Sequence, residues 1–182
     1  GHHAADVRRL RNGEAVWLTD GTGTRWEGVV EAARRGALDV LIERVTTDPA
    51  PTPRLVAVQA LAKGGRDEDA VEAMTEVGVD EIVAWQASRS IAKWTDRTAA
   101  KWQSTADAAA RQARRVWWPQ VVGPATTADL ATRIGAAGLA LVLPESAEAT
   151  FGDIDRDNLA RHRREDVAVV GGGGSRAVLP VN

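Results

Sequence analysis

The spacing of apolar and polar positions separates a strand-rich first part of the chain from a second part that mixes strands and helices. In the first part, Val16 and Leu18 alternate with Trp17, which places Trp17 on the opposite face of a strand. The predicted strands are Glu14 to Thr19, Thr24 to Val30 and Leu38 to Val45. Because so short a β unit is marginal alone, we expect it to pack against the second part or to lack an opening strand.

The second part alternates continuous apolar runs with segments of helical periodicity. The predicted strands are Leu55 to Leu61, Glu81 to Trp85, Leu139 to Leu143 and Val167 to Val170. The predicted helices are Asp67 to Val77, Thr98 to Arg115 and Thr126 to Ala137. Continuous apolar strands are typical of a buried parallel sheet, so the pattern predicts an α/β domain with a mainly parallel sheet.

The boundary between the two parts is predicted at alternating prolines, Asp48-Pro49-Ala50-Pro51-Thr52-Pro53. Such a segment favours an extended connector and excludes a helix or a central strand. The predicted organisation is a small β domain at 1–48, a linker at 49–54 and an α/β domain at 55–182.

Composition excludes several classes of protein. The chain has no cysteine, which excludes disulfide scaffolds, thiolate zinc sites and cysteine nucleophiles. With three histidines, two of them adjacent, a histidine-rich metal centre is not expected, and we predict no metal. No apolar run is long enough to span a membrane. This composition is compatible with a cytoplasmic protein.

Charge is distributed unevenly along the chain. The net charge is −2, yet residues 89–115 hold seven basic residues against two acidic ones, and Arg8, Arg9 and Arg11 form a second basic group. Two basic groups in an otherwise acidic chain indicate binding of a polyanion.

The end of the long predicted helix is the strongest candidate for that binding. Arg111, Arg114 and Arg115 are spaced three and four residues apart, so we expect them to share one helical face. Arginines at a helix C-terminus can instead serve the helix dipole. Because Val116-Trp117-Trp118-Pro119 follows, the pattern favours phosphate contacts with nearby stacking rings, from RNA or another polyanion.

Two predicted strands end in unusual sequences. Leu143-Pro144-Glu145 begins on the last residue of one strand, and Gly171 to Gly174 follows another. Ligands of parallel α/β sheets bind at the carboxyl ends of strands, and glycines let a backbone approach a ligand closely. The alternative for the glycine run is a flexible loop. It is neither a dinucleotide fingerprint nor a phosphate-binding P-loop, since both lack their other required residues.

Other aromatic and acidic positions have simpler interpretations. Trp85, Trp94 and Trp102 are expected to be packing residues rather than base-stacking ones. Asp67-Glu68-Asp69 is expected to be a solvated first helical turn, because consecutive positions point in different directions and acids favour a helix N-terminus.

Four ordered motifs resemble one known family. Val58 to Arg66 resembles the QALPKGDR-type motif of the 16S rRNA uracil-N3 methyltransferases, which belong to the SPOUT class. The segment AVEAMTEVGVDEIVAWQASRSIAKW is similar to that family's helix, strand and serine-arginine-serine segment. KWQSTADAAARQARRVWWPQV resembles its R-W-x-x-I-x-x-E-A-A-x-Q-S-x-R-x-x-x-P motif. GHHAADVRRLRNGEAVWLTDGTG is similar to its small PUA-like RNA-binding barrel.

The resemblance implies a C-terminal trefoil knot, S-adenosylmethionine as cofactor and a cytoplasmic homodimer. It implies methylation of N3 of a uridine in 16S rRNA of the small ribosomal subunit, without a metal, and Glu145 is a candidate catalytic residue. The implied cofactor-binding residues are Leu143, Pro144, Glu145, Gly171, Gly172, Gly173, Gly174, Leu179, Pro180 and Asn182. The implied RNA contacts are Arg8, Arg9, Arg11, Lys63, Arg66, Arg89, Arg111, Arg114 and Arg115.

The chain departs from this family at its end. Four glycines stand where the family has G-P-E-G-G, and the helix, leucine-arginine strand and final helix that follow are missing. We hypothesise that residues are absent between Gly174 and Ser175 and after Asn182. Two alternatives remain open: an RNA-binding module without catalysis, and an α/β scaffold that binds an acidic protein.

Overall fold

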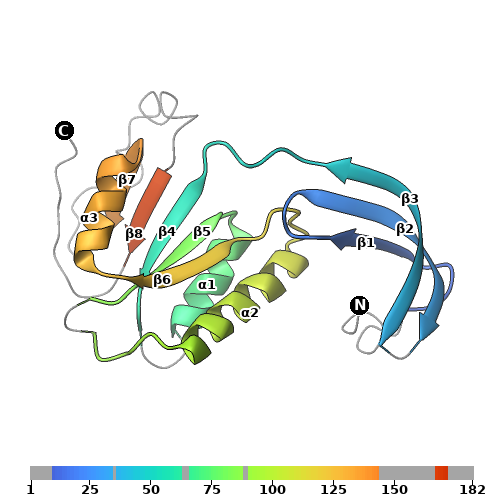
Figure 1. Ribbon diagram of the computed structural model, residues 1–182, viewed down its shortest axis with the longest axis horizontal. Helices are drawn as coiled ribbons and strands as arrows, with labels where there is room; N and C mark the ends of the chain where they lie inside the picture. Colours follow the sequence, from blue (N-terminus) through green and yellow to red (C-terminus); the bar gives the residue numbers. More distant parts are fainter. Residues whose placement is uncertain (1–9, 35, 63–65, 88–89, 144–166, 172–182) are drawn as a thin grey trace. The chain divides into compact units, whose positions relative to one another are not determined.

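The computed structural model describes residues 10–34, 36–62, 66–87, 90–143 and 167–171 of the chain (Figure 1). The chain divides into two compact units, Gly1–Ala50 and Pro51–Asn182. Among the described residues, no helix is both long and apolar enough to cross a membrane.

The first unit contains an antiparallel sheet of three strands, β1 (Ala15–Thr19), β2 (Thr24–Arg34) and β3 (Ala37–Thr47), in the order β1-β2-β3. All three predicted strands are present, and β2 and β3 are longer than predicted. Val16 and Val30 are buried on one face, whereas Leu18, predicted to share the face of Val16, is 37% exposed. Alternation therefore identified the face but not how far the core extends along it.

The turn between β1 and β2 is fastened by an aspartate. The Asp20 carboxylate accepts hydrogen bonds from the backbone N–H groups of Thr22 (2.7 Å) and Thr24 (3.1 Å). The Thr22 hydrogen bond is the main cause that lowers the pKa of Asp20 to about 2. Gly21 and Gly23 adopt positive φ angles of 76° and 102°, which explains the two glycines of this turn.

Gly28 is required where β2 shifts register against β3. A Cβ built on Gly28 would overlap the backbone carbonyl oxygen of Leu41. We expect Gly28→Ala to lower the free energy of unfolding by about 1–3 kcal/mol, the usual range for overpacking, because a backbone atom must move. Gly135→Ala in helix α3 (Thr127–Ala136) is the matched control, since nothing lies within 4 Å of that Cβ. Equal urea-denaturation midpoints for the two variants would contradict the prediction.

In the described part of the second unit, five strands form a parallel sheet in the order β6-β5-β4-β8-β7. Its strands are β4 (Leu55–Ala60), β5 (Glu81–Trp85), β6 (Gln120–Ala125), β7 (Leu139–Leu143) and β8 (Val167–Gly171). The described residues of this unit also form the helices α1 (Arg66–Glu76), α2 (Asp96–Gln112) and α3. The predicted α/β class and parallel sheet are confirmed.

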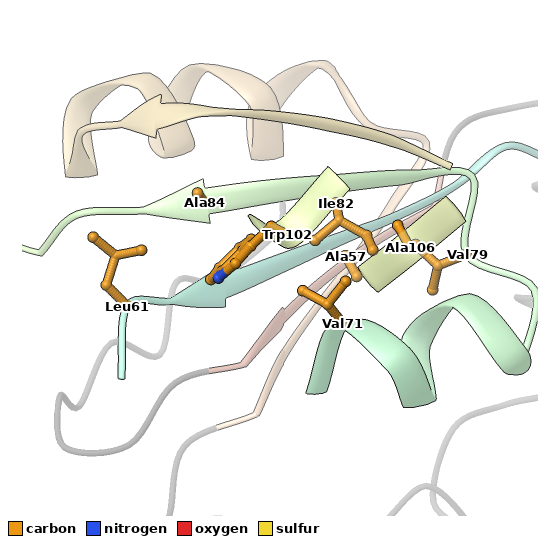
Figure 2. Close-up of a cluster of buried hydrophobic side chains, with 8 residues drawn as sticks. All are labelled: Ala57, Leu61, Val71, Val79, Ile82, Ala84, Trp102 and Ala106. Carbon is orange, nitrogen blue, oxygen red and sulfur yellow. The ribbon is translucent and has the colours of Figure 1, made fainter. Parts of the chain in front are cut away.

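The sheet carries an apolar core on each face. On one face, Ala57 and Ile82 form a buried cluster with Val71 of α1 and Trp102 of α2 (Figure 2). On the other face, a second cluster joins β4 and β5 to Leu130 of α3. Figure 1 shows the same arrangement, with α1 and α2 beside each other and α3 across the sheet. Both clusters use the continuous apolar runs that predicted buried strands.

The observed local structure differs from the predicted one at one strand and one helix. Strand β6 was not predicted, because Gly123 and Pro124 interrupt its pattern; proline is tolerated there since β6 is an edge strand. Helix α2 begins at Asp96, after the N-cap Thr95, and ends at Gln112 rather than at Arg115.

Candidate functional site

The carboxyl edge of the parallel sheet brings together the two unusual strand ends found in the sequence. In β8, Gly171 is paired in register with Leu143 of β7 on one side and with Gln59 of β4 on the other. The first glycine of the Gly171 to Gly174 run therefore lies next to the first residue of Leu143-Pro144-Glu145. Because β8 lies between β4 and β7, Gly171 has a neighbouring strand end on each side along the carboxyl edge of the sheet.

Most of the predicted cofactor-binding residues lie outside the described part of the chain. Leu143 and Gly171 are the two that it includes, as the last residues of β7 and β8. The others, together with the proposed breaks in the chain, fall in ranges 144–166 and 172–182, which are not described. This includes the candidate catalytic residue Glu145.

Hydrogen bonds fasten the neighbouring strand ends to each other. The Leu61 N–H donates to the Trp85 carbonyl oxygen at 3.1 Å, which ties the end of β4 to the end of β5. The Gln86 N–H donates to the Ala125 carbonyl oxygen at 3.1 Å, which ties β5 to β6. The Gln86 side chain then accepts from the Trp94 N–H at 3.0 Å. Hydrogen bonds therefore connect the ends of β4, β5 and β6 along the same edge as Gly171.

The tryptophans beneath this edge are packing residues, as predicted. Trp102 is fully buried, and Trp94 meets it edge to face with ring centroids 5.1 Å apart. The prediction that Asp67 is solvated was wrong. Asp67 is buried, and its carboxylate accepts a hydrogen bond from Trp102 Nε1 at 3.2 Å. The preceding residue, Arg66, is exposed at the first position of α1.

Arg115 is held inside the fold at the opposite, amino edge of the sheet. Its Nη1 donates to the carbonyl oxygens of Thr75 (3.0 Å) and Val79 (2.6 Å). Its Nη2 donates to the Gly78 carbonyl oxygen at 3.3 Å and to Asp80 Oδ1 at 3.0 Å. Burial lowers the pKa of Arg115, while the charge of Asp80 opposes that shift.

Arg111 and Arg114 have different surroundings from Arg115. The Arg111 guanidinium lies 5.3 Å from the centroid of the Trp118 ring, and Arg111 is exposed. Arg114 follows the end of α2 and has a positive φ of 54°. The prediction that all three arginines share one helical face was wrong, because the helix ends before Arg114. The pairing of Arg111 with a nearby aromatic ring is present.

The carboxyl edge of the sheet and the Arg111–Trp118 pair lie at opposite ends of α2. The helix starts beside the carboxyl end of β5, where Trp94 contacts Gln86. It ends near the amino end of β5, where Arg115 contacts the residues just before Glu81. The helix has 17 residues, which corresponds to about 25 Å.

Of the remaining predicted RNA contacts, only some belong to the described residues. Arg11, in the first unit, is exposed, and its backbone N–H donates to the Glu14 carboxylate at 3.0 Å. Four predicted contacts lie outside the described residues: Arg8, Arg9, Lys63 and Arg89.

A charge cluster at the amino edge was missed by the sequence analysis. The buried carboxylate of Glu81 binds Arg54, which precedes β4, and Arg133 of α3 at 2.7 Å. Its members come from three segments far apart in the sequence, so no local spacing connects them. Both arginines remain partly exposed, at 41% and 46% of their side chains.

Comparison with known families gives two matches. Residues 48–174 match a family described as RNA methyltransferase domain, and residues 1–43 match one described as RNA methyltransferase PUA domain. A Mycobacterium tuberculosis protein named ribosomal RNA small subunit methyltransferase E is 43% identical over 85% of this chain. A Synechocystis protein of the same name is 28% identical over 78% of this chain. This chain spans 62% of the mycobacterial relative and 46% of the Synechocystis one.

Solved structures share the fold. A ribosomal RNA small subunit methyltransferase E from Neisseria gonorrhoeae, bound to S-adenosyl methionine, superposes with a TM-score of 0.75 at 20% identity, covering 93% of this chain and 69% of that one. A putative methyltransferase from Legionella pneumophila with bound cofactor SAM gives a TM-score of 0.70 at 21% identity, covering 97% and 81%.

Proposed function

Because this chain belongs to the RNA methyltransferase family, we propose that it transfers a methyl group from S-adenosylmethionine to N3 of a uridine in 16S ribosomal RNA. The observation that carries the proposal is the pairing of Gly171 with Leu143 at the carboxyl edge of a parallel sheet. A relative named for small-subunit rRNA methylation, at 43% identity, supports the substrate.

The residues present at this edge fit a nucleoside cofactor. The two strand ends are adjacent, the glycine at 171 has no side chain to keep a ligand away from the backbone, and the neighbouring strand ends are hydrogen-bonded to each other. Leu143 and Gly171 would hold the cofactor with the other eight predicted residues. S-adenosylmethionine supplies an electrophilic methyl group on a sulfonium.

The protein's own contribution to this reaction is positioning and charge control. N3 of uracil must lose its proton and lie in line with the methyl group, so the site has to orient the base and stabilise its developing negative charge. Glu145 remains the candidate for a catalytic residue. A metal is not required for such a transfer.

Three finer features belong to the same proposal. We expect the residues after β7 to form the trefoil knot of the SPOUT class, and two chains to form a homodimer. We expect the first unit to be a PUA-like barrel that binds RNA, in line with the family match at residues 1–43. An enzyme that acts on ribosomal RNA would work in the cytoplasm.

The direct test combines cofactor binding with methyl transfer. We expect calorimetry to show saturable binding of S-adenosylmethionine at one site per chain, because the site is built from one sheet edge. We expect the labelled methyl group to enter 16S rRNA of small ribosomal subunits, with large subunits as the control. Absence of both binding heat and incorporation would reject the proposed function.

A second candidate, RNA binding without catalysis, is favoured by one observation. The Arg111–Trp118 pair combines an exposed cation with a half-buried aromatic ring, which suits RNA, yet lies at the edge opposite Gly171. Binding of 16S rRNA with neither cofactor binding nor methyl incorporation would identify this function instead.

A further inference from the structure

The solvent-facing side of α2 is cationic along its length. We define the α2 stripe as Arg97, Lys101, Ser104, Ala108 and Arg111. All five residues are exposed, and their spacing of four, three, four and three places them on one side of the helix. The stripe contains three cations, two small uncharged residues and no carboxylate. It therefore offers positive charge without bulky side chains in its middle.

The neighbouring helix α1 has the opposite charge. Its exposed residues include Asp69, Glu72 and Glu76, at a spacing that also places them along one side of a helix. The two helices lie beside each other on one face of the sheet (Figure 1) and are joined by the ion pair of Lys101 with Glu68. A polyanion near this face would be repelled by α1 and attracted to α2.

The α2 stripe runs from the carboxyl edge of the sheet to the Arg111–Trp118 pair, two candidate binding regions that the sequence indicated separately. Arg97 lies at the end of α2 next to the carboxyl edge, where Trp94 contacts Gln86. Arg111 lies at the other end, against the Trp118 ring. The fourteen-residue separation corresponds to about 21 Å along the helix, which is long enough for several phosphates of one strand.

We propose that the α2 stripe is the track along which the backbone of the RNA substrate lies, with the Arg111–Trp118 pair as its distal anchor. This inference rests on the proposed function, because that function makes RNA the partner. Arg97, Lys101 and Arg111 contact phosphates, and Ser104 and Ala108 let the backbone approach the helix closely. The Trp118 ring, oriented by its Nε1–H donation to the Arg115 carbonyl oxygen at 3.0 Å, is placed to stack on an unpaired base.

Charge reversal in the middle of the stripe tests the proposal. We expect Ser104→Glu to weaken binding of deproteinised 16S rRNA by about tenfold in a filter-binding assay, because it places a carboxylate among phosphates. The matched control is Ala73→Glu, at an exposed position of α1, which should change the affinity less than about twofold. Equal denaturation midpoints for the two variants establish that both are folded.

Salt dependence gives a second readout on separate residues. We expect Arg97→Ala and Arg111→Ala each to lower the slope of log affinity against log salt by about 0.7–0.9, the loss of one phosphate contact. Binding of S-adenosylmethionine should be the same as in the unmodified protein, since neither residue lies at the paired strand ends.

The outcomes separate the stripe from the proposed function. Unchanged rRNA affinity and salt slope in Ser104→Glu would overturn the stripe, even if methyl transfer occurs. Poly-glutamate bound as tightly as rRNA, and weakened equally by Ser104→Glu, would assign the stripe to an acidic protein and also overturn it. An unmodified protein that binds rRNA through the stripe without transferring a methyl group would sustain the stripe and reject the enzyme.

Discussion

Trp102→Ala is expected to lower the free energy of unfolding of the second unit by about 3–5 kcal/mol, the usual cost of emptying a buried tryptophan site. Trp102 has no exposed surface and lies between α2 and the sheet, among Leu61, Ile82 and Ala84 (Figure 2). Its loss leaves a cavity and also removes the hydrogen-bond donor to the buried Asp67 carboxylate. Urea denaturation followed by circular dichroism measures the change.

Trp102→Phe separates the lost hydrogen bond from the lost packing, and Val77→Ala serves as a control at an exposed position. Trp102→Phe retains most of the packing but leaves Asp67 without the indole donor, so we expect a smaller loss of about 1–3 kcal/mol. Val77→Ala, at a side chain that is 76% exposed, should change the stability by no more than about 0.5 kcal/mol. A loss for Trp102→Ala no larger than that for Val77→Ala would show that the core in Figure 2 is not the stabilising one.

Arg115→Ala is expected to lower the free energy of unfolding by about 2–4 kcal/mol, because it breaks a mostly buried ion pair. The side chains of Arg115 and Asp80 are 13% and 11% exposed, and the substitution leaves the Asp80 charge without its cation. It also removes the donor to three backbone carbonyl oxygens at the end of α1. Thermal unfolding monitored by circular dichroism would show the loss as a lower midpoint.

Nearby substitutions provide the controls for Arg115. Arg111→Ala, four residues earlier and exposed, should cost no more than about 1 kcal/mol, mainly from its contact with Trp118. Arg115→Lys should be intermediate, since one ammonium cannot replace a planar fork that reaches four acceptors. If Arg115→Ala and Arg111→Ala unfold at the same midpoint, Arg115 is not the structural residue that its contacts indicate.

These results would assign the two arginines to different tasks. Both belong to the segment that resembles the family's arginine-containing motif, and both were predicted to contact RNA. The guanidinium of Arg115 donates hydrogen bonds to acceptors within the protein, whereas Arg111 is exposed beside an aromatic ring. A loss of RNA affinity in Arg115→Ala would therefore have to be separated from a loss of folded protein.

The sequence by itself determined the elements and the class of the fold. The apolar run Leu55 to Leu61 identified a buried strand, since Val56, Ala57 and Val58 are buried and such strands are covered on both faces. Gly21 and Gly23 supply the positive φ angles of the turn after β1, a property that glycine carries in the sequence itself. Ordered motifs identified the family, which the match over residues 48–174 confirms.

The tertiary structure alone decided which of these residues meet. Strand order placed Gly171 beside Leu143 and Gln59, a pairing that hydrogen-bonding between distant segments fixes and that local periodicity does not contain. Likewise, Asp67 and Arg115 carry charges that a sequence assigns to solvent. Asp67 is buried and Arg115 is mostly buried, because the partners that offset their desolvation, Trp102 for Asp67 and Asp80 for Arg115, come from elements packed against them after folding.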